Sequence, residues 1–299
     1  MQSTDQAAER TQGADPMETP ARVAHRMWTL FEPVHVVTYF SAEARSTFEE
    51  AGLRGFWRGY FAGRSAPLGT VAAAPVTASF FTFAPAMVSR ALPAVWELIS
   101  PDKALAARAA GAVAALRRLL SGADVSVAAD LMAAAVADLD CPGRVLAAAN
   151  EALALPDEPV ARMWQCATLL REHRGDGHFA TLVAADIDGC ESLALQAANG
   201  ISRELVQPLR GWTDQEWDAA VARLADRGLL TSDGEATPEG TAFRASIEDR
   251  TDEAAARPWR DPDLVAKLIA ALTPIAEACA AELPHPNPIG LRAGRVGRG

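Results

Sequence analysis

Apolar residues recur at helical spacing along most of this 299-residue chain, and strand-like alternation is almost absent. Long alanine-rich stretches with few β-branched runs favour helices as well. Only one short hairpin is predicted, within residues 229–237, where apolar residues flank an Asp-Gly turn. The predicted fold class is therefore mainly α, with helices over residues 20–40, 42–51, 85–92, 101–120, 125–139, 143–153, 160–173, 179–185, 190–198, 213–227, 238–257 and 261–283.

Proline, glycine and charge clusters divide this pattern into segments. We expect residues 1–18 to be a disordered tail and residues 19–154 to form a helical domain. The Pro-rich stretch 155–159 is the best linker candidate. Residues 155–283 are expected to form a second, winged-helix-like domain with a C-terminal helix, packed against the first, and residues 284–299 a flexible tail.

Composition and charge exclude several classes of protein. The net charge of −10 disfavours non-specific binding to DNA or to an anionic membrane. Four widely spaced cysteines and no secretion signal favour a reduced, cytoplasmic protein, and no apolar run is long enough to span a membrane. The chain lacks a dinucleotide-binding glycine motif, a Walker loop and a nucleophile elbow, so we expect no cofactor.

The hexapeptide 173–178 (HRGDGH) concentrates polar chemistry around two glycines, between two predicted helices. A sharp turn is expected there, with Asp176 capping the second helix and free backbone N–H groups attracting an anion. His173 and Arg174 would add donors. A metal site of His173, Asp176 and His178 fits less well, because the spacing is irregular. A solvated, capped turn is the third interpretation.

The first predicted helix places Trp28, Glu32, His35 and Tyr39 at i, i+4, i+7 and i+11, on one face. Glu32 can orient His35 as a general base, while Tyr39 donates to an oxyanion. The same four side chains can equally form a buried hydrogen-bonded network.

The aromatic segment 55–64 is a second candidate for a ligand site. Trp57 or Tyr60 can wall a pocket while Arg58 or Arg64 holds a carboxylate or phosphate. An aromatic core helix with its arginines in solvent is the favoured alternative.

The C-terminal half carries the features of a known fold. Residues 222–230 (ARLADRGLL) and 237–240 (TPEG) resemble the recognition helix, wing and trailing helix of MarR-type regulators. The whole chain is similar to an actinobacterial family of helical proteins of about 300 residues, through residues 28–35, 55–64 and 171–178. The resemblance implies a winged-helix C-terminal half but no particular activity.

The charge of this half weakens the case for DNA binding. Between residues 213 and 240 the sequence contains seven acidic residues and two arginines, and the predicted wing tip is Asp233-Gly234-Glu235. Phosphate contacts need Lys and Arg at these positions.

Our leading hypothesis is a small-molecule enzyme or ligand-binding protein on a repurposed winged-helix scaffold. Its interdomain pocket would take an acidic or aromatic ligand for cofactor-independent cyclase, lyase or hydrolase chemistry, as in secondary metabolism. The alternative is a MarR-like ligand-responsive regulator, for which a homodimer is expected, and a third is an acidic interaction module. The candidate catalytic residues are Glu32, His35, Tyr39, His173, Asp176 and His178, and the candidate ligand-binding residues are Trp28, Trp57, Arg58, Tyr60, Arg64 and Arg174, with no metal.

Overall fold

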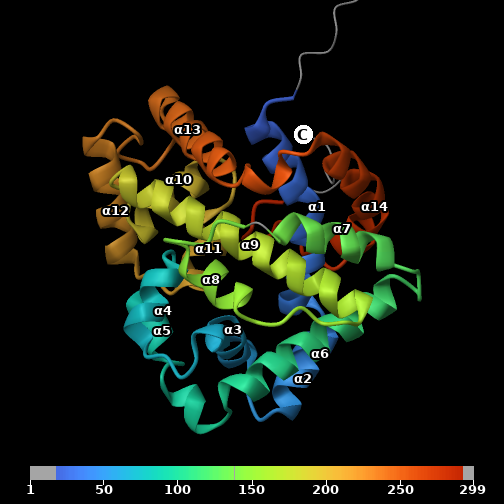
Figure 1. Cartoon of the computed structure of the whole chain (residues 1–299). Coiled ribbons are helices and arrows are strands. Elements are labelled where there is room, and N and C mark those ends of the chain that lie inside the picture. The colour runs from blue at the N-terminus through green and yellow to red at the C-terminus, as the bar shows by residue number, and fades with distance from the viewer. Residues whose placement is uncertain (1–17, 138, 292–299) are drawn as a thin grey trace, which may run out of the picture.

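The computed structural model describes residues 18–137 and 139–291, and within them the protein is helical almost throughout (Figure 1). The expected tail residues 1–17 and 292–299 lie outside the described residues. The first half contains α1 (Pro20–Phe40), α2 (Ala42–Glu50), α3 (Phe56–Ser65), α4 (Ala73–Phe80), α5 (Pro85–Ser89), α6 (Pro101–Leu119), α7 (Ser126–Val136) and α8 (Val145–Glu151). The second half contains α9 (Pro159–Ala184), α10 (Gly189–Ala198), α11 (Arg203–Arg210), α12 (Asp214–Asp226), α13 (Pro238–Ala254) and α14 (Pro262–Ala280).

The mainly α fold class is confirmed, and α1 has the bounds that the apolar pattern predicts. The capping box that starts α12 is also present. The Thr213 hydroxyl accepts a hydrogen bond from the Glu216 N–H, and the Glu216 carboxylate accepts one from the Thr213 N–H. Local signals of this kind were sufficient to place most helix starts.

The turn predicted at residues 173–178 is wrong, because α9 runs through the hexapeptide without a break. The short separate helix predicted from 179 to 185 is therefore the end of α9. A glycine inside a helix costs only about 1 kcal/mol relative to alanine. That cost is offset because α9 packs against α1, α6, α7, α8 and α13, so tertiary packing outweighs the local preference.

The two-stranded wing is also wrong within the described part of the chain. Residues 229–237 make a single isolated antiparallel bridge between Leu230 and Ala236, closed by a hydrogen bond from the Thr231 N–H to the Glu235 carbonyl oxygen. Thr237 then caps α13 by accepting a hydrogen bond from the Gly240 N–H. This leaves too few residues for a strand ladder, so residues 229–237 form a tight turn between α12 and α13.

The long helix α9 joins the apolar clusters of the protein. Its first half lies in the cluster formed with α1, α6, α7 and α14, and Leu182 near its end belongs to the cluster of α10, α11, α12 and α13. A further cluster lies among α2, α3, α4, α5 and α6. In Figure 1, α9 crosses the middle of the molecule, with α10, α12 and α13 at its one end and α6 and α7 near its other end.

The two helices α2 and α6 pack at unusually close range. A Cβ atom added at Gly111 of α6 would lie 2.6 Å from the Ala44 Cα atom and 2.5 Å from the Thr47 Oγ1 atom of α2. Glycine is thus required there by the backbone of a neighbouring helix. By contrast, a Cβ atom at Gly175 of α9 would meet nothing closer than 3.9 Å.

We expect Gly111→Ala and Gly175→Ala to change stability in opposite directions. Gly175→Ala should raise the free energy of unfolding by about 0.5–1 kcal/mol, because alanine is the better helix former and has room. Gly111→Ala should lower it by about 1–3 kcal/mol through steric overlap with α2. Urea denaturation followed by circular dichroism measures both. A destabilising Gly175→Ala would argue against a continuous α9.

Candidate functional site

A cavity of about 590 Å³ lies between the N-terminal helices and the C-terminal helix-turn-helix region. Its walls come from α1, α9, α10, α11 and α13 and from the segment that follows α14, which contributes His285 and Ile289. The described residues that line it include four arginines and two glutamates: Arg171, Arg174, Arg210, Arg244, Glu32 and Glu248. The cavity therefore combines a large, partly open volume with a concentration of charge.

One wall of the cavity is a charged cluster that joins α9 to α13 and α1. The Arg174 Nη2 atom lies 2.8 Å from the Asp252 Oδ1 atom and 3.2 Å from the Glu248 Oε2 atom. The same guanidinium lies over the Trp28 ring, 4.5 Å from its centroid. His25 contacts Asp252 at 3.0 Å through its Nδ1 atom. Arg174 is thus fixed by two carboxylates and one aromatic face.

A second charged cluster lies deeper, around the buried Glu172. This carboxylate accepts two hydrogen bonds from Arg64, at 2.9 and 3.0 Å, and one from Arg171 at 2.7 Å. Burial raises the pKa of Glu172, but the guanidinium groups of Arg171 and Arg64 outweigh it and hold that pKa well below its usual range. Glu172 is therefore ionised and shared between two cations.

Glu32 connects this deeper cluster to the cavity. Its side chain is 3% exposed, lies 3.8 Å from the Arg171 Nε atom, and accepts a hydrogen bond from the Trp28 Nε1 atom at 3.1 Å. Burial raises the pKa of Glu32, and Arg171 and Arg174 oppose that shift. The carboxyl group thus binds protons more readily than a solvated glutamate.

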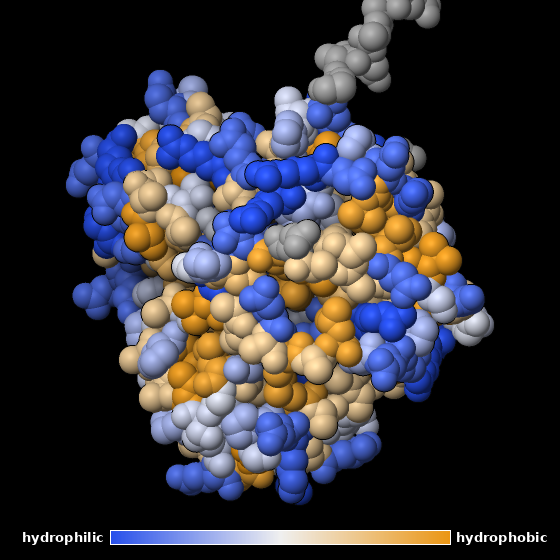
Figure 2. All heavy atoms as spheres, viewed as in Figure 1, coloured by the Kyte–Doolittle hydropathy of each residue, from blue (hydrophilic) through white to orange (hydrophobic). Residues whose placement is uncertain are grey.

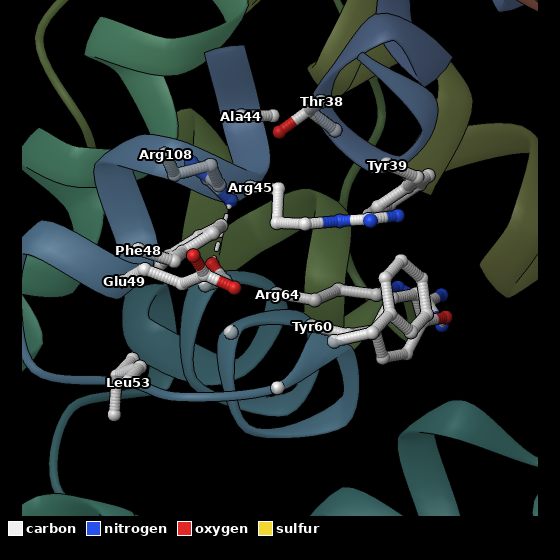
Figure 3. A pocket seen from close by; sticks show the side chains of 14 residues that line it. Thr38, Tyr39, Ala44, Arg45, Phe48, Glu49, Leu53, Tyr60, Arg64 and Arg108 are labelled. Carbon is white, nitrogen blue, oxygen red and sulfur yellow. Dashed lines mark hydrogen bonds between the residues drawn. The ribbon is translucent and has the colours of Figure 1, made fainter. Parts of the chain in front are cut away.

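A separate small cavity of about 30 Å³ is lined by Arg64, which does not line the large cavity (Figure 3). Figure 3 shows the Tyr39, Tyr60 and Arg64 side chains gathered at one end of it. The Arg64 Nη1 atom donates to the Tyr60 hydroxyl at 3.2 Å, and Arg108 donates to the Gly63 carbonyl oxygen at 3.2 Å. Burial lowers the pKa of Arg108 to about 10. This volume suits a water molecule better than an organic ligand.

The structure divides the sequence-predicted site residues between these two places. The large cavity is lined by Trp28, Glu32, Arg174 and His178, and the small one by Tyr39, Tyr60 and Arg64.

His35 lies between the two cavities but lines neither. Its Nδ1 atom contacts the Thr168 hydroxyl at 3.0 Å and its Nε2 atom contacts the Tyr39 hydroxyl at 3.2 Å. Burial lowers its pKa well below the usual value. The predicted stripe is thus shared between a cavity wall and a buried hydrogen-bonded network.

Two predicted site residues of the hexapeptide, Asp176 and His173, do not line the cavity. Asp176 accepts hydrogen bonds from the Leu146 and Ala147 N–H groups at 2.8 and 2.9 Å, so it caps α8 and not a helix of its own segment. Burial raises the pKa of Asp176 to about 6. His173 is buried away from the cavity, and burial lowers its pKa to about 4.

The aromatic segment forms α3, as its core-helix interpretation predicts. Trp57 packs against Phe61 and Phe83, and Arg58 is exposed to solvent. Arg64 departs from that interpretation because it is buried against Glu172.

Sequence reasoning missed Arg171, Arg210, Arg244 and Glu248. Arg171, Arg174 and His178 follow i, i+3 and i+7 spacing, which marks one helix face once α9 is taken as continuous. Arg210 and Arg244 come from other helices and carry no such signal.

The helices α11 and α12 have the geometry of a helix-turn-helix. Gly211 ends α11 in the left-handed conformation at φ 79°, and Trp212 and Thr213 complete the turn before α12 begins.

A family model described as a helix-turn-helix family matches residues 24–286. The chain belongs to this helix-turn-helix family. No curated protein and no solved structure matches the chain. The match covers both halves of the protein, so the family model includes the N-terminal helices as well as the helix-turn-helix itself.

The exposed face of the helix-turn-helix is acidic. Arg203 pairs with Asp214 and Asp218, at 2.8 and 3.2 Å. Arg223 pairs with Asp188 and Glu191 at 2.5 and 2.6 Å. Figure 2 shows predominantly hydrophilic residues over α12 and α13. Arg203 and Arg223 are therefore neutralised locally.

Two other kinds of site are absent from residues 18–137 and 139–291. No group of three His, Cys, Asp or Glu side chains there could hold a metal ion. No helix in the same ranges is long and apolar enough to cross a membrane.

We expect Glu172→Gln to lower the free energy of unfolding by about 3 kcal/mol or more, because Arg64 and Arg171 both lose a buried carboxylate. Glu43→Gln is the matched control, since Glu43 pairs with the half-exposed Arg118. That change should cost less than about 1 kcal/mol. Urea denaturation of the two variants provides the comparison. Equal losses would show that the buried cluster adds no more than a surface ion pair.

Proposed function

We propose that this protein is a ligand-responsive member of the helix-turn-helix family. In this proposal a small organic molecule occupies the large cavity, and the helix-turn-helix carries the response. The observation that supports it best is that helices of both halves of the protein form the cavity wall. Ser192, Leu193 and Gln196 of α10 and Arg210 of α11 line the same volume as Trp28 and Arg174.

The size and lining of the cavity suit a small organic ligand. Its volume of about 590 Å³ falls in the range usual for ligand sites. Phe179, Leu193 and Ile247 supply apolar contact, and Trp28 offers an aromatic wall. Charged groups stand beside these surfaces, so the ligand that fits best has an apolar body and at least one polar group.

Contacts within the C-terminal half provide a route from the cavity to α12. Arg210 directly precedes the Gly211 turn, and α10 packs against α12. A ligand that touches α10 and the end of α11 can therefore bias the position of α12. The bias is limited to the difference in affinity that the ligand has for the two arrangements.

An acid–base enzyme is the second candidate, because Glu32 and His178 line the same cavity. Burial lowers the pKa of His178 to about 4, so its imidazole is neutral at pH 7, and burial raises the pKa of Glu32. A base and an acid of this kind are the groups that proton transfer requires. Mass spectrometry of small molecules before and after incubation with the protein separates binding from turnover, since only an enzyme changes the masses of the molecules that it releases.

We expect Gly175→Leu to block the cavity without unfolding the protein, because Gly175 lines it and its helical backbone accepts leucine. The neutral fluorescent probe N-phenyl-1-naphthylamine should bind the unmodified chain and lose most of that binding in Gly175→Leu. Ala180→Leu adds the same side chain at an exposed position of α9 and should bind the probe normally. Equal probe binding by the two variants would contradict the cavity as the ligand site.

A DNA readout requires α12 and the following turn to face the duplex. The acidic face predicts weak binding to a labelled random-sequence 30-base-pair duplex, with a salt slope of log K no steeper than about −2. The double variant Asp233→Lys/Glu235→Lys should tighten binding and steepen that slope, as measured by fluorescence anisotropy. The control Glu97→Lys/Asp102→Lys makes the same charge change on the exposed surface of the N-terminal half. Equal effects of the two double variants would exclude a DNA-facing turn.

A further inference from the structure

Arg210 lines the large cavity and, unlike the other arginines there, has a buried nitrogen atom without a hydrogen-bond partner among the described residues. Its side chain makes no ion pair with any carboxylate in the described ranges, and its buried Nε atom has no hydrogen-bond partner. The guanidinium lies over the Phe83 ring, 4.6 Å from the centroid. An aromatic face attracts a cation but does not replace a hydrogen-bond acceptor.

Of the other cavity arginines, Arg171 and Arg174 form ion pairs with carboxylates, whereas Arg244 forms none with the described residues. Arg174 has Asp252 and Glu248, and Arg171 has Glu172 and Glu32. Arg244 stands beside Glu248, close enough to lower the pKa of that carboxyl group.

Burial lowers the pKa of Arg210, and the nearby guanidinium groups of Arg64 and Arg171 lower it as well, while Tyr60 and Tyr39 act in the opposite direction. Arg64 and Arg171 share the Glu172 carboxylate, whereas Arg210 forms no ion pair with the described residues. The end of α11 therefore brings an unpaired positive charge to the cavity wall, in a protein whose net charge is −10.

The backbone around Arg210 is held in place by the α4–α5 connection. The Ala84 N–H donates to the Arg210 carbonyl oxygen at 2.9 Å, and the Trp212 Nε1 atom donates to the Thr82 carbonyl oxygen at 2.9 Å. These two bonds fix the residues on either side of the Gly211 turn. The backbone that carries Arg210 is thus fixed, and Phe83 of the same connection lies under its guanidinium, which reduces the ordering cost of binding.

We propose that Arg210 binds the anionic head group of the cavity ligand. The ligand class is an organic anion with an apolar or aromatic body, its head group being a carboxylate, a phosphate or a sulfonate. All three present acceptor oxygens that match a guanidinium. The body lies against the apolar and aromatic side chains of the same cavity: Trp28, Phe179, Leu193 and Ile247. This inference rests on the proposed function, because it assumes that the cavity is a ligand site.

Two fluorescent probes with the same arylamine body test the charge preference. 8-Anilinonaphthalene-1-sulfonate carries a sulfonate, and N-phenyl-1-naphthylamine is its neutral counterpart. Arg210→Met should weaken binding of the sulfonate about tenfold or more while leaving the neutral probe within about twofold. Arg210→Lys retains the charge and should restore part of the sulfonate affinity, and thermal unfolding of both variants checks that they are folded.

The Gly175→Leu variant separates the failure of this inference from the failure of the proposed function. If Gly175→Leu abolishes binding of both probes and Arg210→Met weakens only the sulfonate, the anion site is supported. If Gly175→Leu abolishes both but Arg210→Met leaves the sulfonate unchanged, the cavity stands and the anion site is overturned. If Gly175→Leu changes neither probe, the cavity itself is not the ligand site, and both proposals fail.

Discussion

The buried carboxylate of Glu172, shared by Arg64 and Arg171, is the interaction on which the site depends. Without it the buried Arg64 guanidinium would lose its carboxylate partner, at a cost of several kcal/mol, and Arg171 would lose its nearest one. Because Arg64 comes from α3 while Glu172 and Arg171 come from α9, the cluster ties the aromatic N-terminal region to the central helix. It also sets the direction of the neighbouring groups, since Arg171 reaches the large cavity and Arg64 reaches the small one.

The central helix α9 gives this cluster its functional setting. The same helix carries Arg171, Arg174, Gly175 and His178 along the cavity and contacts both the N-terminal helices and α13. This member of a helix-turn-helix family thus contains a large charged cavity, and Arg210 of α11 is part of its wall. The outer face of the helix-turn-helix carries paired charges, whereas Arg210 brings to the cavity wall an arginine without an ion pair in the described ranges.

Local chemistry in the sequence was a good guide where a signal acts within a few residues. The Thr213–Glu216 capping box, the Pro20 helix start and the aromatic helix around Phe61 all follow from such signals. The hexapeptide was misjudged because glycine weakens a helix only slightly, and burial of α9 on five other helices exceeds that loss. Asp176 shows the same limit, since the backbone that it caps belongs to α8, about 30 residues away.

The sequence by itself determined the helical class, most helix starts, the acidic character of the C-terminal half and the polar stripe that includes Trp28 and Glu32. These properties depend on composition and on neighbours within one or two turns. Only the tertiary structure decided which polar groups share a cavity: Glu32 and His178 do, whereas His35 and His173 are enclosed in the core. It also singled out Arg210. That this side chain lacks an ion pair with the described residues is evident only when the α4–α5 connection, α9 and α11 are placed together, because charge balance in a buried site depends on distances in space rather than along the chain.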